Sequence, residues 1–125
     1  MNKLEKKVAI INHCLNVVEE TSKRRGWRSR PCDVTIYMPG IADIMPTANA
    51  IRVQKLEHYN PANYHLTYTH KMHFVHINLE HSWERDIASF DKQPVSIQDR
   101  VLEYINGLQH GDVEKVGRMN FYSMK

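Results

Sequence analysis

Apolar and polar residues alternate along positions 2–24 with the period of an α-helix. Apolar side chains recur every three or four positions and, with their apolar neighbours, cover about half of the helix circumference. Gly26 marks the expected end. The pattern predicts one long amphipathic helix, whose broad apolar face suits a sheet better than a narrow dimer seam, although a dimer partner stays open as an alternative. The apolar positions are Leu4, Val8, Ile10, Ile11, Cys14, Leu15, Val17 and Val18.

Two segments after this helix read as strands. Residues 33–38 alternate strictly, which predicts a half-buried strand that ends at Pro39 and Gly40. Its expected core side consists of Val34, Ile36 and Met38, and its expected solvent side of Asp33, Thr35 and Tyr37. Residues 40–49 have no clear period and are expected to form a loop. Residues 50–58 are ambiguous between strand and helix, and we favour a strand with a bulge or at an edge.

The clearest β pattern covers residues 64–80. A tight turn at Lys71 and Met72 pairs apolar residues on one face and polar residues on the other, so we predict a hairpin in that register. The predicted apolar pairs are Tyr68 with Val75, Leu66 with Ile77, and Tyr64 with Leu79. The weak point is the turn, because Lys-Met lacks the Gly or Asn that two-residue turns usually need.

In the last third of the chain, the residue pattern predicts a short helical turn over residues 81–90, followed by a helix and a final strand. Ser96 is the expected N-cap of the helix, and His110 and Gly111 its expected end. Its apolar stripe is Ile97, Val101, Tyr104, Ile105 and Leu108. Residues 118–124 alternate as a last strand. The order predicts an α+β fold: an antiparallel sheet of three to four strands, with a long N-terminal helix and a C-terminal helix packed on one face.

Composition agrees with one globular domain over residues 1–125. The chain is 42% hydrophobic and 25% charged, and it has no apolar run long enough to span a membrane. The N-terminus is charged and lacks the apolar core of a secretory signal. Cys14 and Cys32 have neither metal nor redox spacing. We therefore expect a cytoplasmic protein with two plain thiols and no membrane contact.

Positive charge is concentrated in one segment, the basic linker 23–31 between the first helix and the sheet. The chain has 17 Lys and Arg against 14 Asp and Glu, and five of the basic residues lie between positions 23 and 30. The candidate anion-binding or nucleic-acid-binding residues are Lys23, Arg24, Arg25, Trp27, Arg28 and Arg30. Arg side chains grip phosphate and Trp can stack on a base. The alternative is a solvated helix end, where cations favour the negative end of the dipole.

Histidines form a second cluster. On the predicted hairpin, His65 and His76 share the solvent face, and Glu80 is the nearest third ligand for a zinc ion. A small metal- or His-dependent hydrolase is the function that this site would support. A polar sheet face without a ligand explains the same residues, and we favour it and expect no cofactor.

The loop after the first strand is unusually apolar, and Met38, Ile41, Ile44 and Met45 together would suit a protein partner. Nucleotide-binding glycine motifs and nucleophile elbows are absent from the sequence. We therefore expect a non-enzymatic binding or regulatory module, whose partner is nucleic acid or an acidic protein surface. A homo-oligomer is left open. A structural subunit of a viral or other assembly is a further alternative, based on element order alone.

Overall fold

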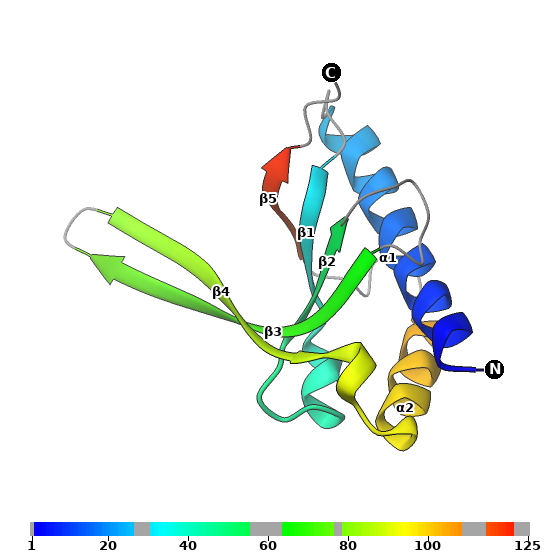
Figure 1. Ribbon diagram of the computed structural model, residues 1–125. Coiled ribbons are helices and arrows are strands. Elements are labelled where there is room, and N and C mark those ends of the chain that lie inside the picture. Colours follow the sequence, from blue (N-terminus) through cyan, green and yellow to red (C-terminus); the bar gives the residue numbers. More distant parts are fainter. Residues whose placement is uncertain (1, 27–30, 56–63, 77–78, 109–114, 122–125) are drawn as a thin grey trace.

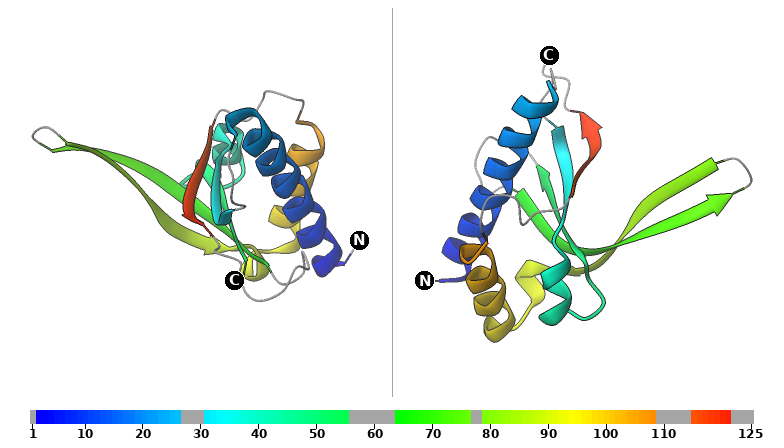
Figure 2. Two further views of the ribbon diagram at one scale, coloured as in Figure 1. Left: turned by 90° about the horizontal axis from the view of Figure 1, so that it is seen from above. Right: turned by 180° about the vertical axis from the view of Figure 1, so that it is seen from behind.

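The computed structural model describes residues 2–26, 31–55, 64–76, 79–108 and 115–121. In these residues a curved sheet carries two helices on one face (Figures 1 and 2). The elements are α1 (Lys3–Arg25), β1 (Pro31–Tyr37), the 3₁₀ helix η1 (Pro39–Asp43), β2 (Ala50–Lys55), β3 (Tyr64–His76), β4 (Leu79–Ser89), the 3₁₀ helix η3 (Phe90–Lys92), α2 (Val95–Asn106) and β5 (Lys115–Phe121).

The sheet has five strands in the order β4-β3-β2-β1-β5, and every neighbouring pair is antiparallel. The first four strands follow one another along the chain as a meander. β5 arrives after α2 and adds to the free side of β1. The predicted α+β class, with an N-terminal and a C-terminal helix on an antiparallel sheet, is confirmed, and the described sheet is one strand wider than expected.

The predicted first helix is confirmed, and its ends have clear causes. The Asn2 side chain accepts a hydrogen bond from the Glu5 backbone N–H at 2.8 Å, and the Glu5 carboxylate accepts one from the Asn2 N–H at 3.3 Å. This reciprocal cap satisfies two N–H groups that have no partner inside the helix. At the other end Gly26 takes the left-handed conformation, with φ of 65°, as the predicted stop residue.

The apolar face of α1 lies against the core of its own chain. Ile10, Ile11, Cys14 and Val18 are buried, whereas Leu4 at the start of the stripe is 54% exposed. α1 also packs on α2. Lys6 pairs there with Asp99 of α2, and Lys7 pairs with Asp91 of η3 at 3.1 Å. The middle of the predicted stripe therefore serves the core.

Three central strands supply the other half of the core. Register places Ile36 of β1 beside Ile51 of β2, and Ile51 beside Tyr68 of β3. All three are fully buried. The strand favoured for residues 50–58 is confirmed as β2 over Ala50–Lys55, and residues 56–58 lie outside the described ranges. The expected bulge or edge position is wrong, because β2 lies between β1 and β3 and pairs with both without a register shift.

The predicted hairpin turn is wrong. β3 continues through Lys71 and Met72 to His76, and β4 returns from Leu79. His70 pairs with Arg85 instead of His73, and Val75 pairs with Glu80 instead of Tyr68. Lys-Met lacks the Gly or Asn that a tight two-residue turn favours, so nothing in that dipeptide stops the strand.

Two local expectations further along the chain are also wrong. Residues predicted as a helical turn form β4 up to Ser89, and η3 follows. α2 begins at Val95, with Pro94 rather than Ser96 at the N-cap and no side-chain cap. Pro94 has an extended ψ of 153°, as the residue before the first helical position usually does. In place of a side-chain cap, the fully buried Gln98 side chain connects the first turn of α2 to the preceding segment. It donates hydrogen bonds to the Phe90 and Gln93 carbonyls at 3.3 and 3.0 Å.

The predicted α2 stripe is confirmed: Val101 and Ile105 are buried, and its other members pack around them. The helix ends at Asn106 with Gly107 as its C-cap, so the predicted end at His110 and Gly111 is wrong. The predicted last strand exists as β5 and starts at Lys115, three residues earlier than expected. No helix in the part of the chain that the structure describes could cross a membrane.

Candidate functional site: a polar sheet face and a projecting arm

The sheet face turned away from the helices is polar and yet largely buried. Strand alternation places Asp33, Thr35, Arg52, Thr67 and Thr69 on this face, opposite to the core residues. Asp33 and Thr35 were expected to face solvent, but they are only 1% and 2% exposed. They lie on a central strand between β2 and β5, so neighbouring strands flank them on both sides.

Arg52 joins three strands through a charged network. Its Nε and Nη2 donate to the two carboxylate oxygens of Asp33 at 2.9 and 2.6 Å. Its Nη1 donates to both oxygens of Asp86 at 2.8 and 3.1 Å. The hydrogen bond to Asp33 is the main cause that raises the pKa of Arg52, opposed by burial and helped by Asp86. The buried Asp33 carboxylate is thus fully paired, as a buried charge must be.

This network is a brace rather than a catalytic group. A guanidinium stays protonated at all physiological pH values and cannot act as a base. Its donors to Asp33 and Asp86 are already engaged, and the Asp33 carboxylate is buried. The network connects Asp86 of β4 to Arg52 of β2 and Asp33 of β1.

The β3–β4 hairpin extends past the sheet on the side where its two strands are joined. β3 pairs with β2 only over Tyr64–Thr69, and from His70 to His76 it pairs with β4 alone. We call His70–His76 with Leu79–Arg85 the arm. Figures 1 and 2 show the arm projecting from the body in every view. A register shift between Tyr68 and Thr69 lies at its base, and such bulges bend strands.

The predicted zinc ligands are not brought together. His65 pairs with Gln54 in the body, whereas His76 pairs with Leu79 at the far end of the arm. Eleven residues of one strand separate them, or about 36 Å at the usual rise. Glu80 lies near the same far end, opposite Val75. The described residues contain no group of three His, Cys, Asp or Glu that could hold a metal ion.

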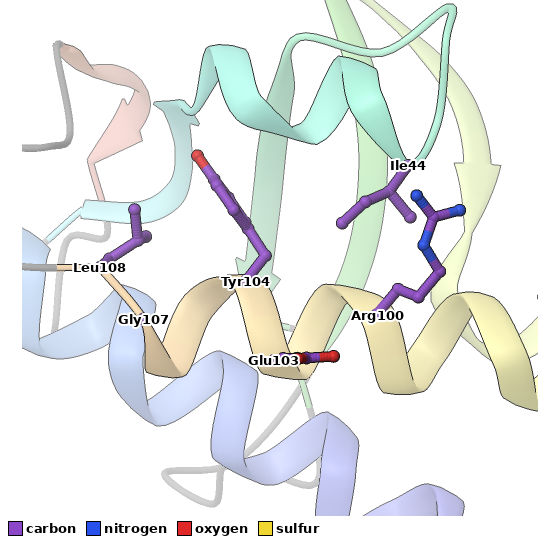
Figure 3. Close-up of a pocket in the computed structure, with 6 residues that line it drawn as sticks. All are labelled: Ile44, Arg100, Glu103, Tyr104, Gly107 and Leu108. Atoms are coloured by element: carbon purple, nitrogen blue, oxygen red, sulfur yellow. The ribbon is translucent and has the colours of Figure 1, made fainter.

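The apolar loop does not present a partner surface. Met38 and Ile41 are fully buried, Ile44 is 9% exposed and Met45 is half-buried. They close one end of the core, where η1 packs on α2 (Figure 3). Packing is so close that a Cβ at Gly40 would lie 2.5 Å from the Tyr104 ring. A protein partner would need these residues exposed, but three of the four are buried, where they stabilise the fold of their own chain.

The basic segment is described only at its start. Lys23 has a side chain 77% exposed and lies 3.7 Å from Glu19, and Arg24 donates to Thr21 Oγ1 at 3.5 Å. Both lie in the last turn of α1. The side chain of Arg25, and the whole of Trp27, Arg28 and Arg30, fall outside the described part.

One hollow lies between η1 and α2 on the surface. It has a volume of about 440 Å³ and is wide open to solvent (Figure 3). Arg100 donates to the Asp43 carbonyl at 3.0 Å beside it. The lining mixes one acid and one base with apolar side chains and offers no arrangement of nucleophile and base. It consists of Ile44, Arg100, Glu103, Tyr104, Gly107 and Leu108.

Neither a protein family nor a characterised protein nor a solved structure matches this chain. The arm and its brace are therefore the features that a proposal must explain. Sequence reasoning missed both. The signal for the arm was the unsuitable Lys-Met turn, and the signal for the brace was a lone Arg52 between the strand residues Ile51 and Val53.

Proposed function

We propose that the protein is a non-enzymatic binding module, a subunit of a larger assembly, that docks on a macromolecular partner through the β3–β4 arm. The observation that carries this proposal is the arm itself. Its two strands pair only with each other among the described residues. A lone two-stranded hairpin is marginally stable in water and needs a third strand or a packed face. A partner that covers the arm supplies what the chain's own body does not.

The base of the arm supports the same function. The Arg52 guanidinium holds Asp86 directly below the first arm pair, His70 with Arg85. The bulge between Tyr68 and Thr69 sets the angle at which the arm leaves the sheet. A braced base fixes the direction of the arm, and a fixed direction lowers the conformational cost of docking.

Shortening the arm tests this proposal. Because His70 and Arg85 form a register pair, residues 71–84 can be replaced by Asn-Gly, which favours a tight hairpin turn. We expect the free energy of unfolding to change by less than about 1 kcal/mol, since the arm strands pair only with each other and project from the body (Figure 2). Complexes captured with the full chain from cells that produce it should be lost with the shortened chain.

The matched control keeps the arm and replaces Arg24, Arg25, Arg28 and Arg30 by Ala. This control should retain the captured complexes. Retention of every complex by the shortened chain, or loss of all of them in the control, would contradict docking through the arm.

The exposed end of α1 supports a second candidate, contact with an anionic partner such as nucleic acid. Lys23 and Arg24 begin a run of five basic residues within eight positions. Phosphate contacts of this kind release counterions, which makes binding depend on salt.

The fourfold Ala variant at Arg24, Arg25, Arg28 and Arg30 should bind nucleic acid more weakly. The slope of log affinity against log salt should fall by about 1 for each phosphate contact removed. Fluorescence anisotropy with labelled single- and double-stranded oligonucleotides across a salt series measures both. Arg100→Ala, on α2, is the control for loss of one charge elsewhere. Absence of wild-type binding at low salt would remove this candidate.

A further inference from the structure

Both edges of the described sheet are open. β4 pairs only with β3, and β5 pairs only with β1. An open edge presents unpaired N–H and C=O groups, so it is a template for another strand. The arm part of β4 stands clear of the body (Figure 2), so the chain's own helices do not cover it.

The two edges carry opposite charge. The arm part of β4 contains Glu80 and Glu84 against Arg85, and β5 contains Lys115 and Arg118 without an acid. Asp86 does not count, because Arg52 binds it. The whole chain has a net charge of +3, so the acidic character belongs to β4 locally. The other side of the arm, in β3, carries only Lys71 as a formal charge and offers a basic strand no attraction.

Length and direction also match. β5 has seven residues, and the arm part of β4 has seven register pairs with β3. Four antiparallel steps separate β4 from β5 in the sheet, so the two strands run in the same direction. A second copy that lies head to tail along the arm therefore brings its β5 alongside β4 as a parallel strand.

We infer that β4 of one copy pairs with β5 of a second copy. This inference rests on the proposed function and names the partner of the arm. Like edges repel, because β4 facing β4 opposes acids and β5 facing β5 opposes bases, and unlike edges attract. The contact uses two different surfaces, so it repeats head to tail and closes into a ring or continues as a filament.

Charge reversal on each edge tests the pairing in the purified full chain. One variant carries Glu80→Lys and Glu84→Lys in β4, another carries Lys115→Glu and Arg118→Glu in β5, and a third carries all four changes. Asp86 is kept because it belongs to the Arg52 network. Light scattering coupled to size-exclusion chromatography gives the mass, which for one chain is 14.7 kDa.

We expect the wild type to exceed the monomer mass and each single-edge variant to dissociate about 100-fold more readily, since like charges face each other. The fourfold variant should regain the wild-type mass, which a misfolded chain could not do. A mixture of the two single-edge variants should also assemble, because every contact in an alternating arrangement is then complementary.

Three outcomes would overturn the inference: a monomeric wild type, an assembly that ignores the β5 changes, or a fourfold variant that stays monomeric although folded by circular dichroism. A monomeric wild type whose captured complexes still need the arm would leave the proposed function standing with a different partner. A monomeric wild type with no arm-dependent complex would remove both.

Discussion

Replacement of Arg52 by methionine is expected to lower the free energy of unfolding by about 3 to 5 kcal/mol. The reason is the carboxylate that remains. Asp33 is 1% exposed, and both of its oxygens accept hydrogen bonds from Arg52. Methionine has comparable length and leaves this buried charge without a partner. Urea unfolding at neutral pH measures the change as a shift of the midpoint at constant slope.

The other carboxylate of the network provides a matched control. The Asp86 side chain is 49% exposed, so water can replace Arg52 as its partner. Asp86→Asn should therefore cost less than about 1 kcal/mol. The double change Arg52→Met with Asp33→Leu should recover most of the lost stability, because it removes the stranded charge. Equal losses for Arg52→Met and Asp86→Asn would show that Asp33 does not depend on the guanidinium.

Elements with a strong local signal could be predicted from the sequence. α1 combines a 3.6-residue apolar period with the Asn2 cap and the Gly26 stop, and all three features are local. β1 alternates, and its core residues were assigned correctly. β2 was recognised as a strand, but its central position in the sheet was not. Helix α2 was placed by its stripe, although its N-cap was not, because Pro94 and the buried Gln98 replace the expected serine cap.

The hairpin register could not be obtained from alternation. When the turn moves from 71–72 to six residues later, residues 73–76 change strand. In the residues that flank both turns, even-numbered positions of the first strand stand opposite odd-numbered positions of the second in either register, so their alternation does not separate the two registers. Only turn chemistry distinguishes them, and Lys71-Met72 argued against the earlier position. The error had a large consequence, because it placed His76 beside His65 rather than at the far end of the arm.

The brace could not be predicted because its residues come from three strands. Arg52 lies 19 residues from Asp33 and 34 from Asp86 along the chain. Nothing local marks such a set, and β1 was judged half-buried because its alternate residues are polar. The apolar loop gave a real signal that was interpreted in the wrong direction. Ile41 and Met38 close the core rather than face a partner.

Ionisation of the buried Cys14 thiol is expected to make the free energy of unfolding fall steeply at alkaline pH. Cys14 is fully buried between α1 and the sheet, and burial raises its pKa from 9.0 to about 12. Burial, and to a lesser degree the Cys14 charge, also raises the pKa of Tyr68. Above pH 9 the unfolded chain loses the thiol proton while the folded chain keeps it. The unfolded state then binds fewer protons, so stability falls as pH rises.

One group of this kind contributes a slope of about −1.4 kcal/mol per pH unit, so Cys14 alone should cost roughly 4 kcal/mol between pH 9 and pH 12. Below pH 9 its contribution is fully present and constant. Cys14→Ala should lower stability at pH 8 through the lost side-chain volume, yet flatten the alkaline slope by about 1.4 kcal/mol per unit. Tyr68→Phe should flatten it separately at higher pH. Urea unfolding at half-unit intervals from pH 8 upwards measures these slopes, and an unchanged slope in Cys14→Ala would show that the thiol is hydrated or ionised in the folded chain.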